Sequence, residues 1–167
     1  MSATANSMAG GGGNPLKAVC IGLQHGHMGT IGPLKPGWIH TFRQLEGVEV
    51  VAYCEDTATE KLAEAAEYDP EASVYTSVDD LIEKQDFDFA FMALPANEIP
   101  GVGIKLAEAG KHFFIEKQFA RRADDMAEMV RAVRKAGVTV MPAYPHRFNP
   151  VAQDLKRLID LGIFGRP

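Results

Sequence analysis

Short apolar runs alternate with amphipathic stretches along most of the chain. The runs that predict strands are Lys17–Ile21, Val48–Cys54, Ser73–Tyr75, Phe87–Leu94, His112–Ile115 and Val138–Met141. The stretches with apolar residues at helical spacing include Thr59–Tyr68, Ile99–Ala109, Ala123–Ala136 and Pro150–Leu161. Apolar strands that alternate with such helices indicate a parallel sheet covered on both faces. The expected fold is a doubly wound α/β Rossmann-like sheet of about six strands.

Ligands of such sheets lie at the carboxyl ends of the strands, near the point where the strand order reverses. Residues that bind or react are therefore expected directly after a predicted strand. One helix start is also marked locally, because Ser77 followed by Asp80 resembles a capping pair ahead of Leu81 and Ile82.

The composition narrows the class of protein. The 167 residues include 17 Lys and Arg against 22 Asp and Glu, and the formal net charge is −5. The basic residues are scattered, which argues against a nucleic-acid surface. A run of about 18 apolar residues, as a membrane span needs, is absent from the sequence, and so is a signal-peptide pattern. We therefore expect a cytoplasmic domain over residues 16–167, after a disordered tail over residues 1–15.

Cysteines and histidines give no metal signature. Cys20 and Cys54 lie inside apolar runs and are expected to be buried thiols, not a disulfide or a zinc site. His25 and His27 lie two residues apart in a loop, with no further ligands at a known metal-site spacing. Hydrogen bonds to nearby backbone are the expected role of these histidines, and no metal is predicted.

A glycine-rich turn, Gly22–Gly29, follows the first predicted strand. Gly26 and Gly29 keep the second half of the dinucleotide fingerprint G-x-G-x-x-G, while Gly22 lies two residues too far upstream for the first half. Backbone N–H groups of such a turn meet a diphosphate at a helix start. The candidate cofactor-binding residues here are Gly22, Gln24, His25, Gly26, His27, Met28 and Gly29. A turn without any ligand is the alternative.

An acidic pair follows the second predicted strand. Glu55 stands where a carboxylate accepts hydrogen bonds from an adenosine ribose and repels a 2′-phosphate, which favours NAD over NADP. Asp56 is the alternative ribose acceptor if the register shifts by one residue. The alternative role of Glu55 is a solvated cap on the next helix.

Four segments resemble a known family in the same order along the chain. Leu94–Asn97 (LPAN) is similar to a Thr-Pro-Asn turn, and Gly110–Gln118 (GKHFFIEKQ) to a strand that begins Ala-Gly-Lys-His and ends Glu-Lys-Pro. Val50–Glu55 resembles a ribose-binding strand end, and Tyr144–Pro150 (YPHRFNP) a Tyr-Asn-Arg-Arg-Phe-Asp-Pro stretch. Together they resemble the Gfo/Idh/MocA oxidoreductases, the family of glucose–fructose oxidoreductase and inositol dehydrogenase.

The resemblance implies that Lys117 is an active-site lysine, which reaches the nicotinamide ribose and the substrate hydroxyl. A cation there lowers the cost of negative charge on a substrate oxygen during hydride transfer. Glu116 would be a cofactor-side carboxylate, and Arg147 would lie near the substrate. The cofactor crevice would also be lined by Leu94, Pro95 and Asn97. The alternatives are a surface Lys117 paired with Glu116, and an Arg147 salt bridge that closes the domain.

The sequence also departs from the family pattern. Gln118 replaces the proline after the lysine, and Ile99 falls where many members carry a histidine. The glycine loop also carries an insertion, Thr30–Gly37, which would reshape the phosphate cradle. The chain stops where the family passes into a second α+β domain, which supplies an acid/base histidine and the oligomer contacts. We therefore expect a fragment, with a homo-oligomer formed only by the full-length protein.

The implied function is the NAD(P)-binding half of an oxidoreductase. It would transfer a hydride between a nicotinamide cofactor, NAD or alternatively NADP, and a sugar-like or cyclitol alcohol. One alternative is a non-catalytic dinucleotide-binding or regulatory module that kept the fold. Another is a different Rossmann-like enzyme, such as a methyltransferase that uses an adenosyl cofactor.

Overall fold

The computed structural model describes residues 14–29 and 37–165, and this part of the chain contains one parallel six-stranded sheet. The strands are β1 (Leu16–Ile21), β2 (Val48–Cys54), β3 (Ser73–Tyr75), β4 (Phe89–Met92), β5 (His112–Ile115) and β6 (Val140–Pro142). Their order is β3-β2-β1-β4-β5-β6. The order reverses between β1 and β4, which is the point where ligands of doubly wound sheets bind. The predicted fold class is confirmed.

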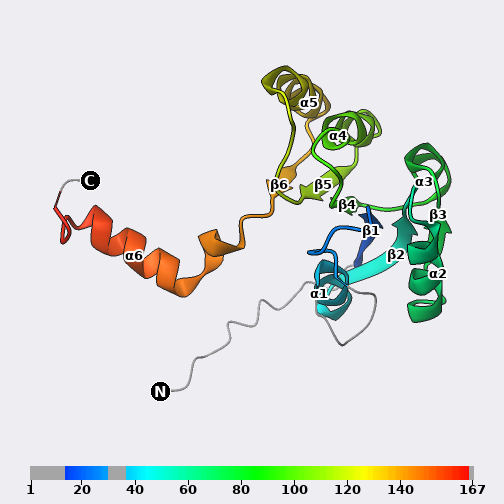
Figure 1. The fold of residues 1–167 in the computed structure, drawn as a ribbon, viewed down its shortest axis with the longest axis horizontal. Coiled ribbons are helices and arrows are strands. Elements are labelled where there is room, and N and C mark those ends of the chain that lie inside the picture. The colour runs from blue at the N-terminus through cyan, green and yellow to red at the C-terminus, as the bar shows by residue number, and fades with distance from the viewer. Residues whose placement is uncertain (1–13, 30–36, 166–167) are drawn as a thin grey trace.

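Helices cover both faces of the sheet (Figure 1). The covering helices are α1 (Trp38–Gln44), α2 (Thr59–Tyr68), α3 (Val78–Lys84), α4 (Ile99–Glu108) and α5 (Ala123–Ala136). The 3-10 helix η1 (Pro145–Phe148) and the helix α6 (Pro150–Asp160) follow β6. Helices α3, α4 and α5 pack on one face, through side chains such as Leu81, Leu106 and Met129. Helices α1 and α2 pack on the other, through side chains such as Phe42 and Leu62.

Strand β1 shows why the strands are apolar on both sides. Val19 and Ile21 belong to the cluster under α3–α5, whereas Ala18 and Cys20 belong to the cluster under α1 and α2. Cys20 and Cys54 are both buried and free, as predicted, and burial raises the pKa of each thiol to about 12. These thiols are therefore core residues.

Several predicted boundaries differ from the structure. The predicted strand Phe87–Leu94 is shorter, because Phe87 packs into the core before β4 begins and the chain turns after Met92. The 3-10 helix η1 was not expected. The predicted cap of α3 is confirmed, since Ser77 Oγ accepts a hydrogen bond from the Asp80 N–H at 3.4 Å. Most of the predicted tail, residues 1–13, and residues 30–36 of the predicted insertion lie outside the described residues.

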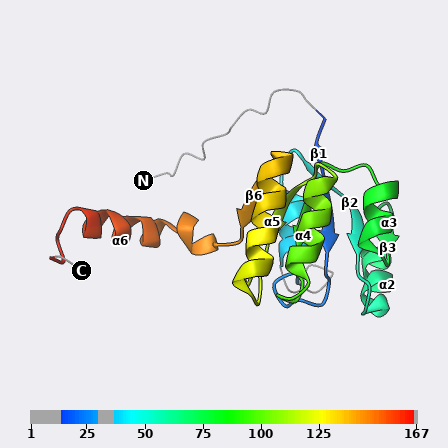
Figure 2. The ribbon, with the colours of Figure 1, turned by 90° about the horizontal axis from the view of Figure 1, so that it is seen from above.

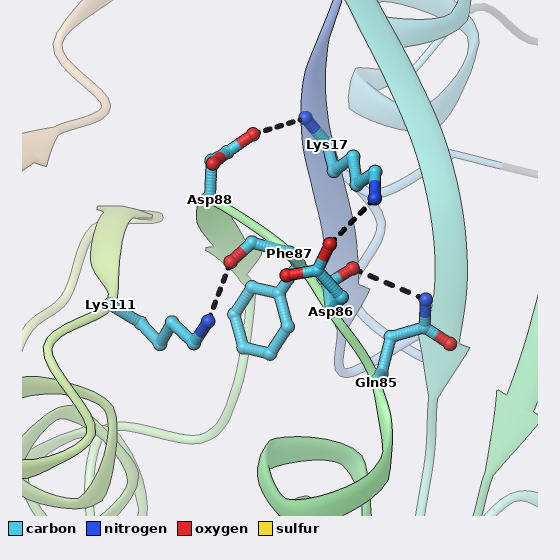
Figure 3. Close-up of polar contacts among 6 residues, drawn as sticks. All are labelled: Lys17, Gln85, Asp86, Phe87, Asp88 and Lys111. Carbon is cyan, nitrogen blue, oxygen red and sulfur yellow. Dashed lines mark hydrogen bonds and ion pairs between the residues drawn. The ribbon is translucent and has the colours of Figure 1, made fainter.

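The amino ends of the strands are joined by polar contacts (Figure 3). The Lys17 N–H donates to Asp88 Oδ2 at 2.7 Å, and the Lys17 ammonium pairs with Asp86 Oδ2 at 2.6 Å. The Lys111 ammonium donates to the Phe87 carbonyl at 2.7 Å and lies over the Phe87 ring. These contacts join β1, β5 and the entry to β4 at the edge of the sheet opposite to the candidate site.

The last helix, α6, extends away from the sheet (Figure 2). None of its described side chains is fully buried. Asn149 caps its start by accepting a hydrogen bond from the Val151 N–H at 2.9 Å. No helix in the described ranges combines the length and apolar character that crossing a membrane requires.

Candidate functional site

Two cavities lie at the carboxyl edge of the sheet, and the glycine turn contributes to both. The acidic cavity, about 200 Å³, is lined by residues that include Gly22, Gln24, His25, Glu55, Asp56 and Pro95. The lysine cavity, about 550 Å³, is lined by residues that include Gly26, His27, Trp38, Glu116, Lys117 and His146. Because His25 lines one cavity and its neighbours Gly26 and His27 line the other, the turn separates the two.

Glu55 is a buried carboxylate that fastens the glycine turn to the start of α2. The Leu23 N–H donates to its Oε2 at 2.7 Å. Its Oε1 accepts from Gln24 Nε2 at 3.1 Å, the Thr57 hydroxyl at 2.8 Å, the Thr57 N–H at 3.1 Å and the Ala58 N–H at 3.2 Å. With only 4% of Glu55 exposed, the alternative of a solvated cap is wrong: the carboxylate is buried, and the N–H groups that it binds precede α2.

The environment keeps Glu55 charged. Burial by itself raises the pKa of the carboxyl, but the hydrogen bonds from Leu23, Gln24 and Thr57 outweigh burial and lower the pKa to about 2. The acidic cavity therefore contains a fixed negative charge. Asp56, which is exposed, lines the same cavity.

The glycine turn offers unpaired donors between the cavities. Gly22 has φ +83°, and a Cβ there would lie 2.5 Å from the Ala93 carbonyl oxygen, so only glycine fits. Within the described residues, the N–H groups of Gln24, His25 and Gly26 have no hydrogen-bond partner. Free N–H groups in a turn after the first strand are what a diphosphate requires, so the turn fits a dinucleotide.

The other residues of the turn have local roles. His25 Nδ1 accepts the His27 N–H at 3.2 Å, which confirms the expected backbone contact for His25. Met28 is fully buried in the core, so its side chain does not reach either cavity. Burial lowers the pKa of His25. The nearby Glu116 raises this pKa, whereas His27 and Lys117 lower it further. In the described ranges, no three His, Cys, Asp or Glu side chains are grouped to hold a metal ion.

Glu116 and Lys117 follow β5 and line the lysine cavity. The Glu116 carboxylate is buried, and Trp38 Nε1 donates to its Oε2 at 3.0 Å. His27 Nδ1 lies 3.2 Å from Oε1, and the Lys117 N–H donates to Oε1 at 3.1 Å. The Lys117 ammonium is 3.9 Å from the same oxygen, and its side chain is half exposed toward the cavity. The Lys117–Gln118 peptide bond is cis.

Of the remaining predicted site residues, some line a cavity and others do not. Leu94 and Pro95 line the acidic cavity. Asn97 is exposed in the next turn and lines neither cavity. Arg147 lies on η1 and is exposed, whereas its neighbours Tyr144 and His146 line the lysine cavity. The alternative salt bridge of Arg147 has no partner among residues 14–29 and 37–165.

Sequence reasoning missed Trp38, Thr57 and His146. Trp38 lies far from β5 along the chain and reaches Glu116 only through the packing of α1. His146 belongs to a 3-10 helix that no pattern indicated. Thr57 carried a weak signal, since a hydroxyl two residues after an acid often bonds to that acid's segment.

A parallel sheet whose switch point carries an acidic cavity, free turn N–H groups and a lysine cavity defines a dinucleotide-binding Rossmann domain. A family model described as an oxidoreductase family with an NAD-binding Rossmann fold matches residues 18–144. The chain belongs to this family, the Gfo/Idh/MocA oxidoreductases. Membership removes the methyltransferase alternative.

Two relatives that the chain matches are dehydrogenases by name, and another is a hydratase. Inositol 2-dehydrogenase of Salmonella typhimurium is 30% identical over 124 residues, which are 74% of this chain and 37% of that protein. D-apiose dehydrogenase of Paraburkholderia graminis is 29% identical, over 77% of this chain and 34% of that protein. The chain thus spans little more than a third of the length of these relatives.

A solved relative has the same fold. The WlbA dehydrogenase of Bordetella pertussis, crystallised with NADH and UDP-GlcNAcA, is 28% identical with a TM-score of 0.74. The alignment covers 92% of this chain and 44% of that one.

Proposed function

We propose that this chain binds NAD and is the cofactor-binding half of a dehydrogenase that acts on a sugar-like or cyclitol alcohol. One observation carries the proposal: N–H donors of the glycine turn, without partners among residues 14–29 and 37–165, lie between a fixed carboxylate, Glu55, and a half-exposed ammonium, Lys117. The carboxylate end suits an adenosine ribose, and the ammonium end suits the alcohol that reacts.

At the acidic end, Glu55 and Asp56 would exclude a 2′-phosphate by charge repulsion. Glu55 already accepts several hydrogen bonds, so the exposed Asp56 is the better placed acceptor for ribose hydroxyls. Together the two carboxylates support a preference for NAD over NADP.

At the lysine end, Lys117 would stabilise negative charge on the substrate oxygen, and Glu116 would hold that lysine in place. Bound NAD would supply the hydride acceptor. Arg147, exposed beside the cavity, is proposed to contact substrate, while the acid/base group and the oligomer contacts are assigned to residues beyond this chain. The relatives' names, inositol, D-apiose and D-xylose dehydrogenase, support a sugar-like substrate class. The cytoplasmic location stays a prediction.

The second candidate is a non-catalytic NAD-binding module. Ile99, which stands where many members of the family carry a histidine, is fully buried in the core and cannot contact a ligand. Oxidation of inositol or xylose by this chain, alone or within a longer protein, would exclude this candidate. NAD binding without turnover of such alcohols would favour it.

Titration calorimetry of the chain with NADH and NADPH tests the binding proposal. We expect NADH to bind more tightly, and Asp56→Ala to narrow the preference over NADPH by about tenfold. Asp124→Ala, which removes an exposed carboxylate from the start of α5, is the matched control and should change neither affinity. A folded chain that binds neither nucleotide contradicts the proposal.

A further inference from the structure

The carboxylate of Glu116 connects three segments that are distant in sequence. Trp38 of α1, His27 of the glycine turn and the Lys117 N–H after β5 all lie within 3.2 Å of its oxygens. Only 2% of Glu116 is exposed. A buried carboxylate with its oxygens occupied in this way has one favoured orientation.

The indole of Trp38 is itself held in place. Its ring centroid lies 5.1 Å from that of Phe114, 5.5 Å from that of Phe91 and 6.2 Å from that of Phe42. Aromatic contacts at these separations fix the ring, so Nε1 is aimed at Glu116 Oε2, and a hydrogen bond to a carboxylate is stronger than one between neutral groups.

Lys117, in contrast, has a long side chain that is half exposed. Its ammonium has one charged neighbour among the described residues, Glu116 Oε1 at 3.9 Å. An exposed ion pair of this length restrains a lysine only if the carboxylate itself is immobile. The position of the ammonium therefore depends on what holds Glu116.

We propose that Trp38 is a positioning residue for Lys117 and acts through its hydrogen bond to Glu116. The reacting end of the site is then organised by α1, which the family motifs do not include. What Lys117 does once positioned rests on the proposed function, but the positioning itself does not.

The test compares two ligands of the same chain. NADH reaches the lysine cavity, whereas ADP-ribose has the adenosine and diphosphate but no nicotinamide. Trp38→Phe keeps an aromatic ring in the cluster and removes the indole N–H. We expect this change to weaken NADH binding about three- to tenfold while ADP-ribose binding stays unchanged. A general loss of structure would weaken both.

Two further variants test whether the effect of Trp38 passes through Lys117. In a Lys117→Met background, Trp38→Phe should have no additional effect on NADH affinity, because the residue through which it acts is gone. Phe42→Leu disturbs the same aromatic cluster but leaves the indole N–H. It should lower the Tm without changing the ratio of NADH to ADP-ribose affinity.

Three results would overturn the proposal: an unchanged affinity ratio in Trp38→Phe, equal losses for both ligands, or an effect that persists without Lys117. If the unaltered chain bound neither ligand, the proposed function would fail, and NMR relaxation of the Lys117 ammonium would decide the positioning alone. Faster motion of the ammonium in the Trp38→Phe chain supports the positioning role of Trp38, and unchanged motion refutes that role.

Discussion

At the scale of single residues, the Glu55 carboxylate has two tasks. Its hydrogen bonds to Leu23 and Gln24 fix the glycine turn, and those to Thr57 and Ala58 fix the turn that leads into α2. The same carboxylate also lines the acidic cavity, which we propose binds the ribose. The same residue therefore holds two segments together and, in the proposed function, influences the choice of cofactor.

The stabilising task has a pH dependence whose sign follows from the pKa. The pKa of Glu55 is lowered from 4.5 to about 2 in the folded chain. The contribution of the carboxylate to folding is therefore complete above about pH 4.5 and is lost as the pH falls toward about 2. We expect Glu55→Gln to lower the free energy of unfolding by about 2 kcal/mol near neutral pH. Urea denaturation at a series of pH values should show this difference shrinking below about pH 4.5.

The neighbouring acid provides the control for this prediction. Asp56 is exposed, so Asp56→Asn should leave the unfolding free energy almost unchanged at every pH. A Glu55→Gln chain as stable as the original at neutral pH would show that the five hydrogen bonds to the carboxylate contribute nothing net.

Single residues also differ in how far their positions can be predicted from the sequence. Glu55 and Lys117 could be found because each directly follows a strand, and strand ends can be read from local apolar runs. The two ends of the motif Gly110–Gln118 lie at opposite edges of the sheet. Lys111 contacts Phe87 at the amino edge (Figure 3), while Glu116 and Lys117 line the lysine cavity at the carboxyl edge. Trp38 could not be found, since its contact with Glu116 depends on how α1 packs.

At the scale of elements, the glycine turn shows how backbone geometry limits side chains. Gly22 has φ +83° and would bring a Cβ to 2.5 Å from the Ala93 carbonyl oxygen, whereas a Cβ at Gly26 would meet nothing within 4 Å. We expect Gly22→Ala to lower the unfolding free energy by about 2–4 kcal/mol, because it combines a strained φ with a clash against backbone.

Gly26→Ala is the matched control within the same turn. It should change the unfolding free energy by less than about 0.5 kcal/mol, since the added methyl group has room. Thermal and urea denaturation of the two variants measure both values. Equal stabilities for the two would mean that the turn relaxes away from Ala93 at little cost.

Elements with strong local signals were predicted with their observed bounds. Val48–Cys54, Thr59–Tyr68 and Ala123–Ala136 match the structure, because apolar spacing and helix-ending residues determine them locally. The strand β4 was predicted too long, since Phe87 is apolar for packing into the core and not for pairing in the sheet. The 3-10 helix η1 was missed because its four residues are too short to show a period.

At the scale of the whole molecule, the described chain consists of a packed sheet-and-helix body and one helix, α6, that does not pack on it. The sheet and its five packed helices enclose two apolar clusters, while α6 extends outward with an apolar face exposed (Figure 2). Val151, Leu155 and Ile159 recur every four residues on that face and are all exposed. Phe164 in the following turn extends it. An exposed apolar face of this kind favours association between molecules.

We therefore expect this chain by itself to self-associate as its concentration rises, measured by sedimentation velocity. Leu155→Glu places a charge in the centre of the apolar face and should shift the chain toward monomer, while NADH affinity stays unchanged because α6 lines neither cavity. Lys156→Gln changes the net charge by the same amount beside that face and should leave association as it was. If the chain stays monomeric at every concentration, the apolar face of α6 does not drive association. If both variants dissociate the chain equally, overall charge controls association and the apolar face does not.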